Sequence, residues 1–157
     1  MPRLVLFAAL LLATGCADSV QNDVGLAEDV LSDPSFGVTD SYVRAAPSGG
    51  VSAVFLTIEN PSAVSDTLLS AATDVSDDVA IHQTTTGEDG MTEMGSVERI
   101  PIPAGATVSL EPGGYHLMLL DLHRALVPGD SLLVELTFAE RGTITPRVPV
   151  RAIGSSE

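Results

Sequence analysis

The sequence contains no lysine and no tryptophan, and its 157 residues include a single cysteine, Cys16. Because this cysteine lies near the N-terminus, the chain that follows it can form no internal disulfide and offers no thiolate as a metal ligand or nucleophile. No nucleophile motif accompanies the three histidines, so hydrolytic chemistry is not indicated. We therefore do not expect an enzyme.

Basic residues of any kind are scarce. All 21 acidic residues follow Cys16, whereas one of the seven arginines, Arg3, precedes it, so the chain after Cys16 has six arginines against 21 acids, a formal charge of −15. Nucleic-acid phosphates require a basic surface, and anionic lipid head groups repel an acidic one. We expect no nucleic-acid partner, and we expect any membrane attachment to come from a covalent lipid.

Long apolar runs are also missing. A membrane-spanning helix needs about 20 apolar residues, and no run in this sequence is that long. The run from Leu4 to Ala13 is shorter and follows Arg3, which is typical of a secretory signal. Residues 13–16, "ATGC", resemble a bacterial lipobox, in which the cysteine becomes the lipidated first residue of the mature protein. We predict a lipoprotein signal peptide at residues 1–15 and lipidation of Cys16; an ordinary signal peptide with an incidental cysteine is the alternative.

Residues 16–35 mix acids with small polar residues and show no sustained hydrophobic period. We interpret them as a flexible, acidic tether that begins at the lipidated Cys16. The protein is then expected outside the cytoplasm, in the periplasm or its equivalent, anchored by lipid to a bacterial membrane. Residues 152–157 form a short tail.

Residues 36–151 consist of short runs rich in β-branched residues, separated by turn-forming segments such as "APSGG", "EPGG" and "VPGD". This texture predicts a single all-β domain, mainly antiparallel, with two sheets packed as a sandwich around one core. The expected strands are residues 41–46, 51–60, 66–73, 78–84, 91–100, 106–111, 115–122, 131–139 and 144–151.

Histidine and methionine, though rare in this chain, occur in short-range pairs. In a β-strand through "YHLMLL", His116 and Met118 project from one face, while Tyr115 and Leu117 project from the other. A polar loop rich in glycine separates His82 from Met94, which predicts a β-hairpin that brings the two residues near each other. Simple packing of Met118 in a core remains an alternative at this point.

The combination of imidazole and thioether donors indicates a particular metal. Thioether sulfur is a soft donor that suits Cu(I), and imidazole accepts copper as well. Zinc sites draw on Cys, His, Asp and Glu and seldom on Met. Residue types and spacing leave a copper site and plain packing about equally supported.

The spacing resembles that of the PCu(A)C family of periplasmic copper chaperones, whose motif is His, ten residues, Met, 21 residues, His-x-Met. Here 21 residues separate Met94 from His116, and His116-Leu117-Met118 completes the motif. Eleven residues separate His82 from Met94, one more than usual, and we place the extra residue in the "TTTGEDG" loop. The segments "VSAVFLTIEN" and "IPIPAGATVSLEPGGYHLMLLDL" are also similar to the family, so the resemblance covers residues 36–151.

The resemblance implies a Greek-key, cupredoxin-like β-sandwich that binds Cu(I) and delivers it to the Cu-A centre, or another copper centre, of a haem-copper oxidase. The ligands it implies are His82, Met94, His116 and Met118. Met91 is an alternative to Met94, but it lies three residues away, so a regular strand would point the two to opposite faces. His123 lies outside the motif and is expected to be exposed. Tyr42 stands where the family often has Trp, which we interpret as a packing substitution.

The resemblance also implies the partners, which are a copper-accepting oxidase subunit or another copper chaperone; we expect a monomer. The tail "RAIGSSE" has no His or Met, so we predict a single copper site. A blue-copper electron carrier is excluded, because its centre requires a cysteine beside two histidines. A copper scavenging or resistance lipoprotein would use the same four ligands and remains open, as does a metal-free adhesion sandwich.

Overall fold

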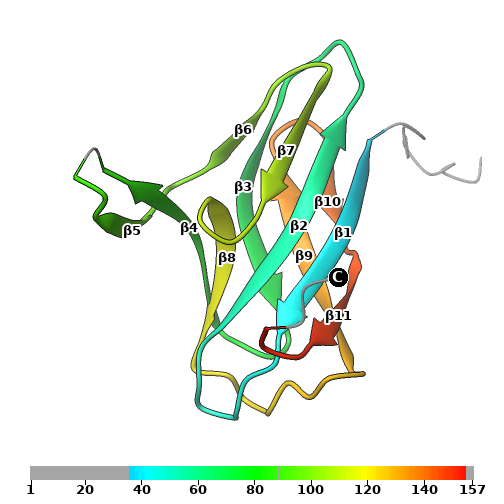
Figure 1. Ribbon diagram of the computed structural model, residues 1–157. Coiled ribbons are helices and arrows are strands. Elements are labelled where there is room, and N and C mark those ends of the chain that lie inside the picture. The colour runs from blue at the N-terminus through cyan, green and yellow to red at the C-terminus, as the bar shows by residue number, and fades with distance from the viewer. Residues whose placement is uncertain (1–35, 88, 155–157) are drawn as a thin grey trace, which may run out of the picture. The chain divides into compact units, whose positions relative to one another are not determined.

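The computed structural model describes residues 36–87 and 89–154, so the signal peptide, the lipidation site at Cys16 and the tether predicted above lie outside the described residues (Figure 1). Within that part of the chain the regular elements are all β-strands. The same residues contain no helix that is long and apolar enough to span a membrane. The eleven strands are β1 (Gly37–Arg44), β2 (Ser52–Asn60), β3 (Asp66–Thr73), β4 (Asp78–Thr86), β5 (Thr92–Ser96), β6 (Ile100–Ile102), β7 (Ala106–Leu110), β8 (Tyr115–Leu120), β9 (Ser131–Phe138), β10 (Gly142–Ile144) and β11 (Arg147–Arg151).

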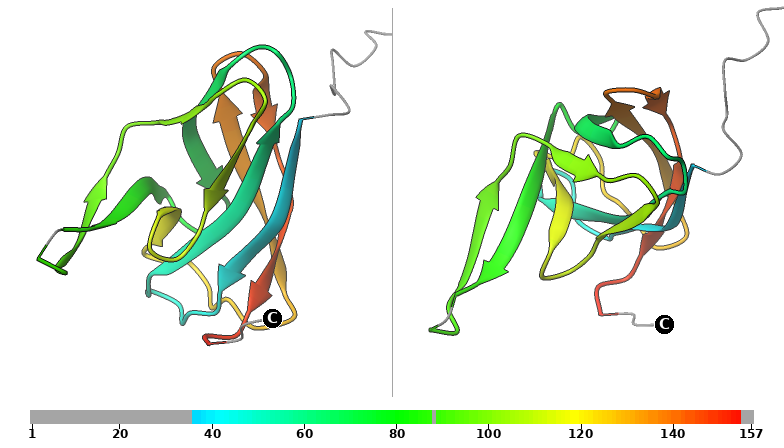
Figure 2. Two further views of the ribbon diagram at one scale, coloured as in Figure 1. Left: turned by 45° about the horizontal axis from the view of Figure 1, so that its top comes forward. Right: turned by 90° about the horizontal axis from the view of Figure 1, so that it is seen from above.

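The strands form two layers that face each other across one core (Figure 2). The first layer has the order β5-β4-β8-β2-β1, with β7 beside the second half of β2. The second layer has the order β11-β9-β3-β6, with β10 also beside β9. The predicted all-β sandwich is therefore confirmed.

Almost every strand pair is antiparallel, as expected, but β1 and β11 run parallel and join the two layers. Their register sets Val43 beside Val150 and Arg44 beside Arg151. A single residue pair, Leu110 with Tyr115, is also parallel. Sequence texture could not foresee these pairings, because strand direction depends on which distant segments become neighbours.

Two of the expected strands are each divided. The segment 91–100 forms β5, which pairs with β4, and β6, which pairs with β3 in the other layer. In the segment 144–151, Ile144 is the last residue of β10 and residues 147–151 form β11, and these two strands pair with different parts of β9. Pro146 lies between these two strands, where it accepts a hydrogen bond from the Val134 amide through its carbonyl but has no N–H to donate.

The core consists of side chains from the inner face of each layer, and β8 illustrates which side chains face inward. Leu117 and Leu119 are fully buried, and Leu117 lies between Ile81 of β4 and Val54 of β2. Since successive residues of a strand point to opposite faces, His116 and Met118 must lie on the outer face of the same layer. The core thus fixes β8 in a register that presents a histidine and a methionine together.

Candidate metal centre

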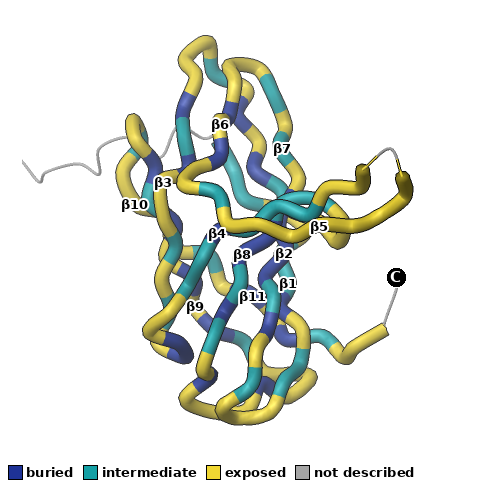
Figure 3. The backbone as a smooth tube through the Cα atoms, turned by 90° about the vertical axis from the view of Figure 1, so that its left-hand side faces the viewer, coloured by how far each residue is buried: buried dark blue, intermediate teal, exposed yellow. Residues whose placement is uncertain are grey.

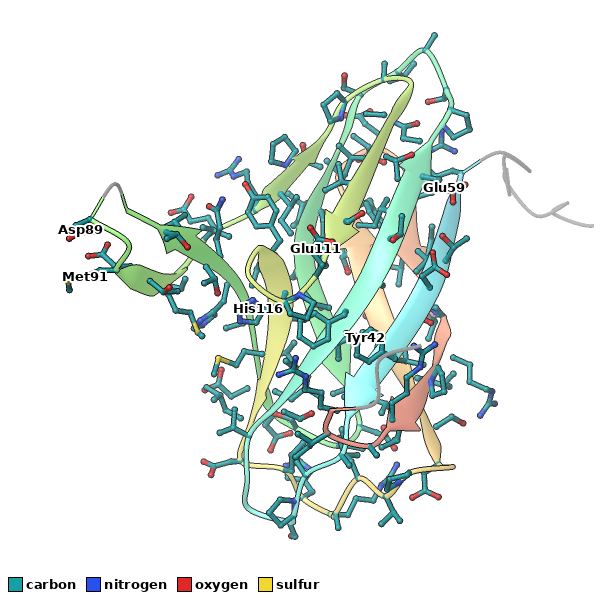
Figure 4. The ribbon with its side chains drawn as sticks, in the orientation of Figure 1. Tyr42, Glu59, Asp89, Met91, Glu111 and His116 are labelled. Atoms are coloured by element: carbon teal, nitrogen blue, oxygen red, sulfur yellow. The ribbon has the colours of Figure 1, made fainter. Side chains whose placement is uncertain are left out.

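The candidate site begins with His116 and Met118, which β8 holds two residues apart on one face. His116 is only 5% exposed although it is on the outer face, and Met118 is half-buried. Phe55 of β2 covers His116 from one side, with its ring centroid 6.2 Å from the imidazole centroid. Figure 4 shows His116 on β8 in the central part of the layer.

A tight turn before β8 orients the His116 imidazole. The turn Glu111–Gly114 is closed by a hydrogen bond from the Gly114 amide to the Glu111 carbonyl, and Gly113 takes a φ of +89°, which favours glycine. The Gly114 carbonyl lies 3.2 Å from Nδ1 of His116. When Nδ1–H donates to that carbonyl, the neutral ring keeps its lone pair on Nε2, ready for a metal.

His82 of β4 is the residue directly opposite His116 in the antiparallel ladder. The two imidazole centroids are 5.8 Å apart, and the rings are inclined by 50°. The Nδ1 atom of His82 is buried and has no hydrogen-bond partner. A buried polar atom without a partner costs about 1–3 kcal/mol, and an ion that ligates it is one of the explanations for such an atom.

Met94 of β5 reaches the same face from the edge of the layer. The β4–β5 ladder pairs His82 with Ser96 and Thr84 with Met94, so Met94 is a diagonal neighbour of His82 and not its direct partner. Met94 is 55% exposed. The ladder runs without a shift to Thr86, which leaves the connecting loop at residues 87–91.

The second methionine of the hairpin, Met91, lies away from this face. It is 64% exposed, and its amide donates to Oδ1 of Asp89 in the loop. Figure 4 shows Met91 and Asp89 at the projecting tip of the hairpin, far from His116, and Figure 3 shows that the hairpin is exposed along β5. The structure therefore brings Met94 to the candidate site and leaves Met91 outside it.

A cavity of about 390 Å³ is lined by Met94, His116 and Met118 together. His82 does not line it, although its ring adjoins His116. A larger cleft of about 480 Å³ lies over β3 and β9, but its lining includes no histidine or methionine. The chemistry of the lining, and not the size of the cavity, identifies the candidate centre.

The donor set is unusual for a metal site. Within residues 36–87 and 89–154, no three or more His, Cys, Asp or Glu residues gather as potential metal ligands. The residues on this face are instead two histidines, His82 and His116, and two methionines, Met94 and Met118, whose donor types suit Cu(I). His123, by contrast, is 47% exposed at its side chain and lies 3.3 Å from Oδ2 of Asp77, so its expected exposure is confirmed.

Sequence reasoning missed two residues that shape the cavity, Phe55 and Arg44. Phe55 packs between the His116 ring and the ring of Tyr42, whose centroid is 5.1 Å away. Arg44 lines the same cavity, with its guanidinium 4.9 Å from the Phe55 centroid. Arg44 could have been noticed in the sequence because basic residues are rare in this chain, with only six arginines after Cys16.

The sandwich and its donor face define a domain with the PCuAC fold. The apo PCuAC domain from PmoF1 matches with a TM-score of 0.65 at 21% identity, over 75% of this chain and 94% of that one. The Cu(I) form of DR1885 from Deinococcus radiodurans matches with a TM-score of 0.57 at 27% identity, over 76% of this chain and 81% of that one.

More particularly, the chain belongs to the LpqE-like family, because the family's sequence model, described as "Putative lipoprotein LpqE-like", matches residues 37–150. A relative from Leifsonia xyli subsp. xyli (strain CTCB07), described as "Putative lipoprotein Lxx21020", is 32% identical over 154 residues, which cover 95% of this chain and 89% of the relative.

Proposed function

We propose that this protein is a Cu(I) metallochaperone, and not an enzyme, held outside the cytoplasm by a lipid on Cys16. The observation that carries the proposal is the unpartnered, buried Nδ1 of His82 beside His116, whose own Nδ1 already has a carbonyl partner. Met94 and Met118 supply soft donors on the same face. The four ligands are then His82, Met94, His116 and Met118.

The comparisons support the cargo and the location. A similar domain from Deinococcus radiodurans has been solved in a form described as containing Cu(I). The descriptions of both the family and the Leifsonia relative read "Putative lipoprotein", which agrees with lipidation at Cys16. The acidic surface, which does not favour anionic lipid, is consistent with attachment through a lipid alone.

Burial of the four side chains suggests how copper would leave. His116 is 5% exposed and held by the Gly114 carbonyl, whereas Met94 is 55% exposed on an edge strand. A thiolate of an acceptor carries a negative charge and attracts Cu(I) more strongly than a neutral thioether does. We expect the acceptor thiolate to replace Met94 first and His116 last, so transfer proceeds by exchange of ligands without a catalyst.

The acceptor that we propose is the Cu-A centre of a haem-copper oxidase, or another copper centre of that enzyme. A scavenging lipoprotein would bind copper through the same residues, so the two roles differ in what a deletion strain loses. A chaperone deletion should lower oxidase activity at low copper and recover when copper is added. A strain with full oxidase activity but increased sensitivity to copper would instead identify a scavenger.

X-ray absorption at the copper edge tests the site itself. Protein loaded with Cu(I) should show a first shell with both nitrogen and sulfur donors, and Met118→Leu should remove sulfur from that shell without unfolding the domain. His123→Ala, which changes a histidine paired with Asp77, is the matched control and should leave the spectrum unchanged. A shell without sulfur would refute the proposed ligand set.

A further inference from the structure

Two arginines stand side by side next to the candidate metal centre. Arg44 of β1 and Arg151 of β11 are direct neighbours in the parallel pair that joins the layers. The guanidinium of Arg44 lies 4.9 Å from the centroid of Phe55, and that of Arg151 lies 4.8 Å from the centroid of Tyr42. The two rings are themselves in contact, so the arginines cover a continuous aromatic surface.

No carboxylate of the described residues lies within ion-pair distance of either guanidinium. This is unexpected in a chain with 21 acidic residues and seven arginines. Two like charges on neighbouring strands destabilise a sheet, and stacking on aromatic rings offsets only part of that cost. Because stacking engages the flat face of a guanidinium, its N–H edge stays available for bidentate bonds to an oxyanion.

The arginine pair adjoins the mouth of the copper cavity. Arg44 lines that cavity together with His116 and Met118. Two exposed apolar residues, Val51 and Ile153, line it as well; they are 50% and 76% exposed. An apolar rim beside unpaired cations is the composition of a protein-docking surface, whereas a free small anion would need only the cations.

We propose that Arg44 and Arg151 bind a carboxylate side chain of the protein that receives the copper, placing the acceptor thiolates over the cavity. The proposal rests on the function proposed above. Asp40 and Glu111 line a small neighbouring cavity together with Tyr42 and Phe55. Because these two carboxylates would repel an anion, the surface that can bind one is limited to the part beside Arg44 and Arg151. A second copy of this chain is not the occupant, because two copies of the part after Cys16, each with a formal charge of −15, repel each other.

The test uses metal-free protein and two short synthetic peptides. One carries two cysteines flanked by several aspartates, and the other has asparagine at each aspartate position. We expect the aspartate peptide to bind at least about fivefold more tightly at low ionic strength, with an advantage that shrinks as salt shortens the Debye length to about 8 Å. Arg44→Gln and Arg151→Gln should each remove most of that advantage, while binding of the asparagine peptide stays the same.

Arg147→Gln is the matched control, because it removes the same charge from the β11 strand at a residue that bonds Oγ of Ser131 and lines the other cleft. If Arg147→Gln weakens the aspartate peptide as much as Arg44→Gln does, the effect is one of net charge and the proposal is wrong. If free acetate binds as tightly as the aspartate peptide, the pair is a small-anion site and the docking role is wrong. Because no copper is present, failure here leaves the copper assignment intact, and failure of copper binding would not alter the peptide result.

Discussion

His82 of β4 and His116 of β8 are directly opposite each other in an antiparallel ladder, with imidazole centroids 5.8 Å apart and with different hydrogen-bonding states. Nδ1 of His116 faces the Gly114 carbonyl, whereas Nδ1 of His82 is buried without a partner. The ladder therefore presents one oriented imidazole and one unpartnered imidazole on the face that also carries Met94 and Met118.

Replacing His82 with leucine should weaken Cu(I) binding without lowering the stability of the metal-free domain. The change removes a proposed ligand and also an unpartnered buried nitrogen, whose desolvation costs about 1–3 kcal/mol. We expect the Cu(I) dissociation constant to rise at least about tenfold, which is a loss of about 1.4 kcal/mol, in a competition assay with a chromophoric chelator. Thermal unfolding of metal-free protein should occur at an equal or higher temperature, and a clear drop in that temperature would show that His82 has a structural role.

The two methionines of the hairpin should differ in their effect on copper. Met94→Leu should raise the Cu(I) dissociation constant several-fold, because Met94 lines the cavity with His116 and Met118. Met91→Leu should leave it unchanged, because Met91 lies at the exposed tip of the hairpin. Equal losses in the two variants would mean that the hairpin rearranges when it binds copper.

Substitutions at two neighbouring residues of β8 should have different effects, one on the stability of the domain and the other on Cu(I) binding. Leu117 is fully buried in the core, so Leu117→Ala should lower the free energy of unfolding by about 2–5 kcal/mol in urea titrations. Met118→Ala, at a half-buried position on the outer face, should cost about 1 kcal/mol and weaken Cu(I) binding instead. Comparable destabilisation by both changes would place Met118 in the core.

The length of the β4–β5 loop should matter less than the register of β5. Deleting Asp89 shortens the loop at residues 87–91 and should leave the Cu(I) dissociation constant within about twofold, since loops absorb length changes. Inserting one threonine after Gly95 should weaken binding several-fold, because the Val97 amide is bonded to the Ile81 carbonyl and a one-residue slip turns Met94 to the other face. A loop deletion as harmful as the insertion would show that loop length sets the site.

Cys16→Ala tests the membrane anchor. If Cys16 carries a lipid, the variant should move from the membrane fraction to the soluble extracytoplasmic fraction, because one lipid-modified residue then provides all of the attachment. The copper affinity of the released domain should be unchanged. Unaltered fractionation would favour an ordinary signal peptide whose cysteine is incidental.

The sequence alone was sufficient to predict the strands in which apolar residues alternate with a clear period of two. Alternation within "YHLMLL" predicted that Leu117 and Leu119 face the core, and both are fully buried, because a strand with one face in the core allows a single register. It did not predict that His116, on the other face, would be only 5% exposed. The division of residues 91–100 and 144–151 between strands was not predictable, since each half follows a partner that is distant in the sequence.

For the site, the sequence determined which donors the protein has: a single cysteine near the N-terminus, few histidines and methionines, and a spacing that pairs them. Only the tertiary structure decided how these donors meet. It set His82 opposite His116, left Met94 diagonal to His82, excluded Met91, and brought Arg44 beside Arg151 at the edge of the same cavity. Residue types fix the chemistry that is available, but relative positions depend on strand pairing between segments far apart in the chain, which local sequence does not encode.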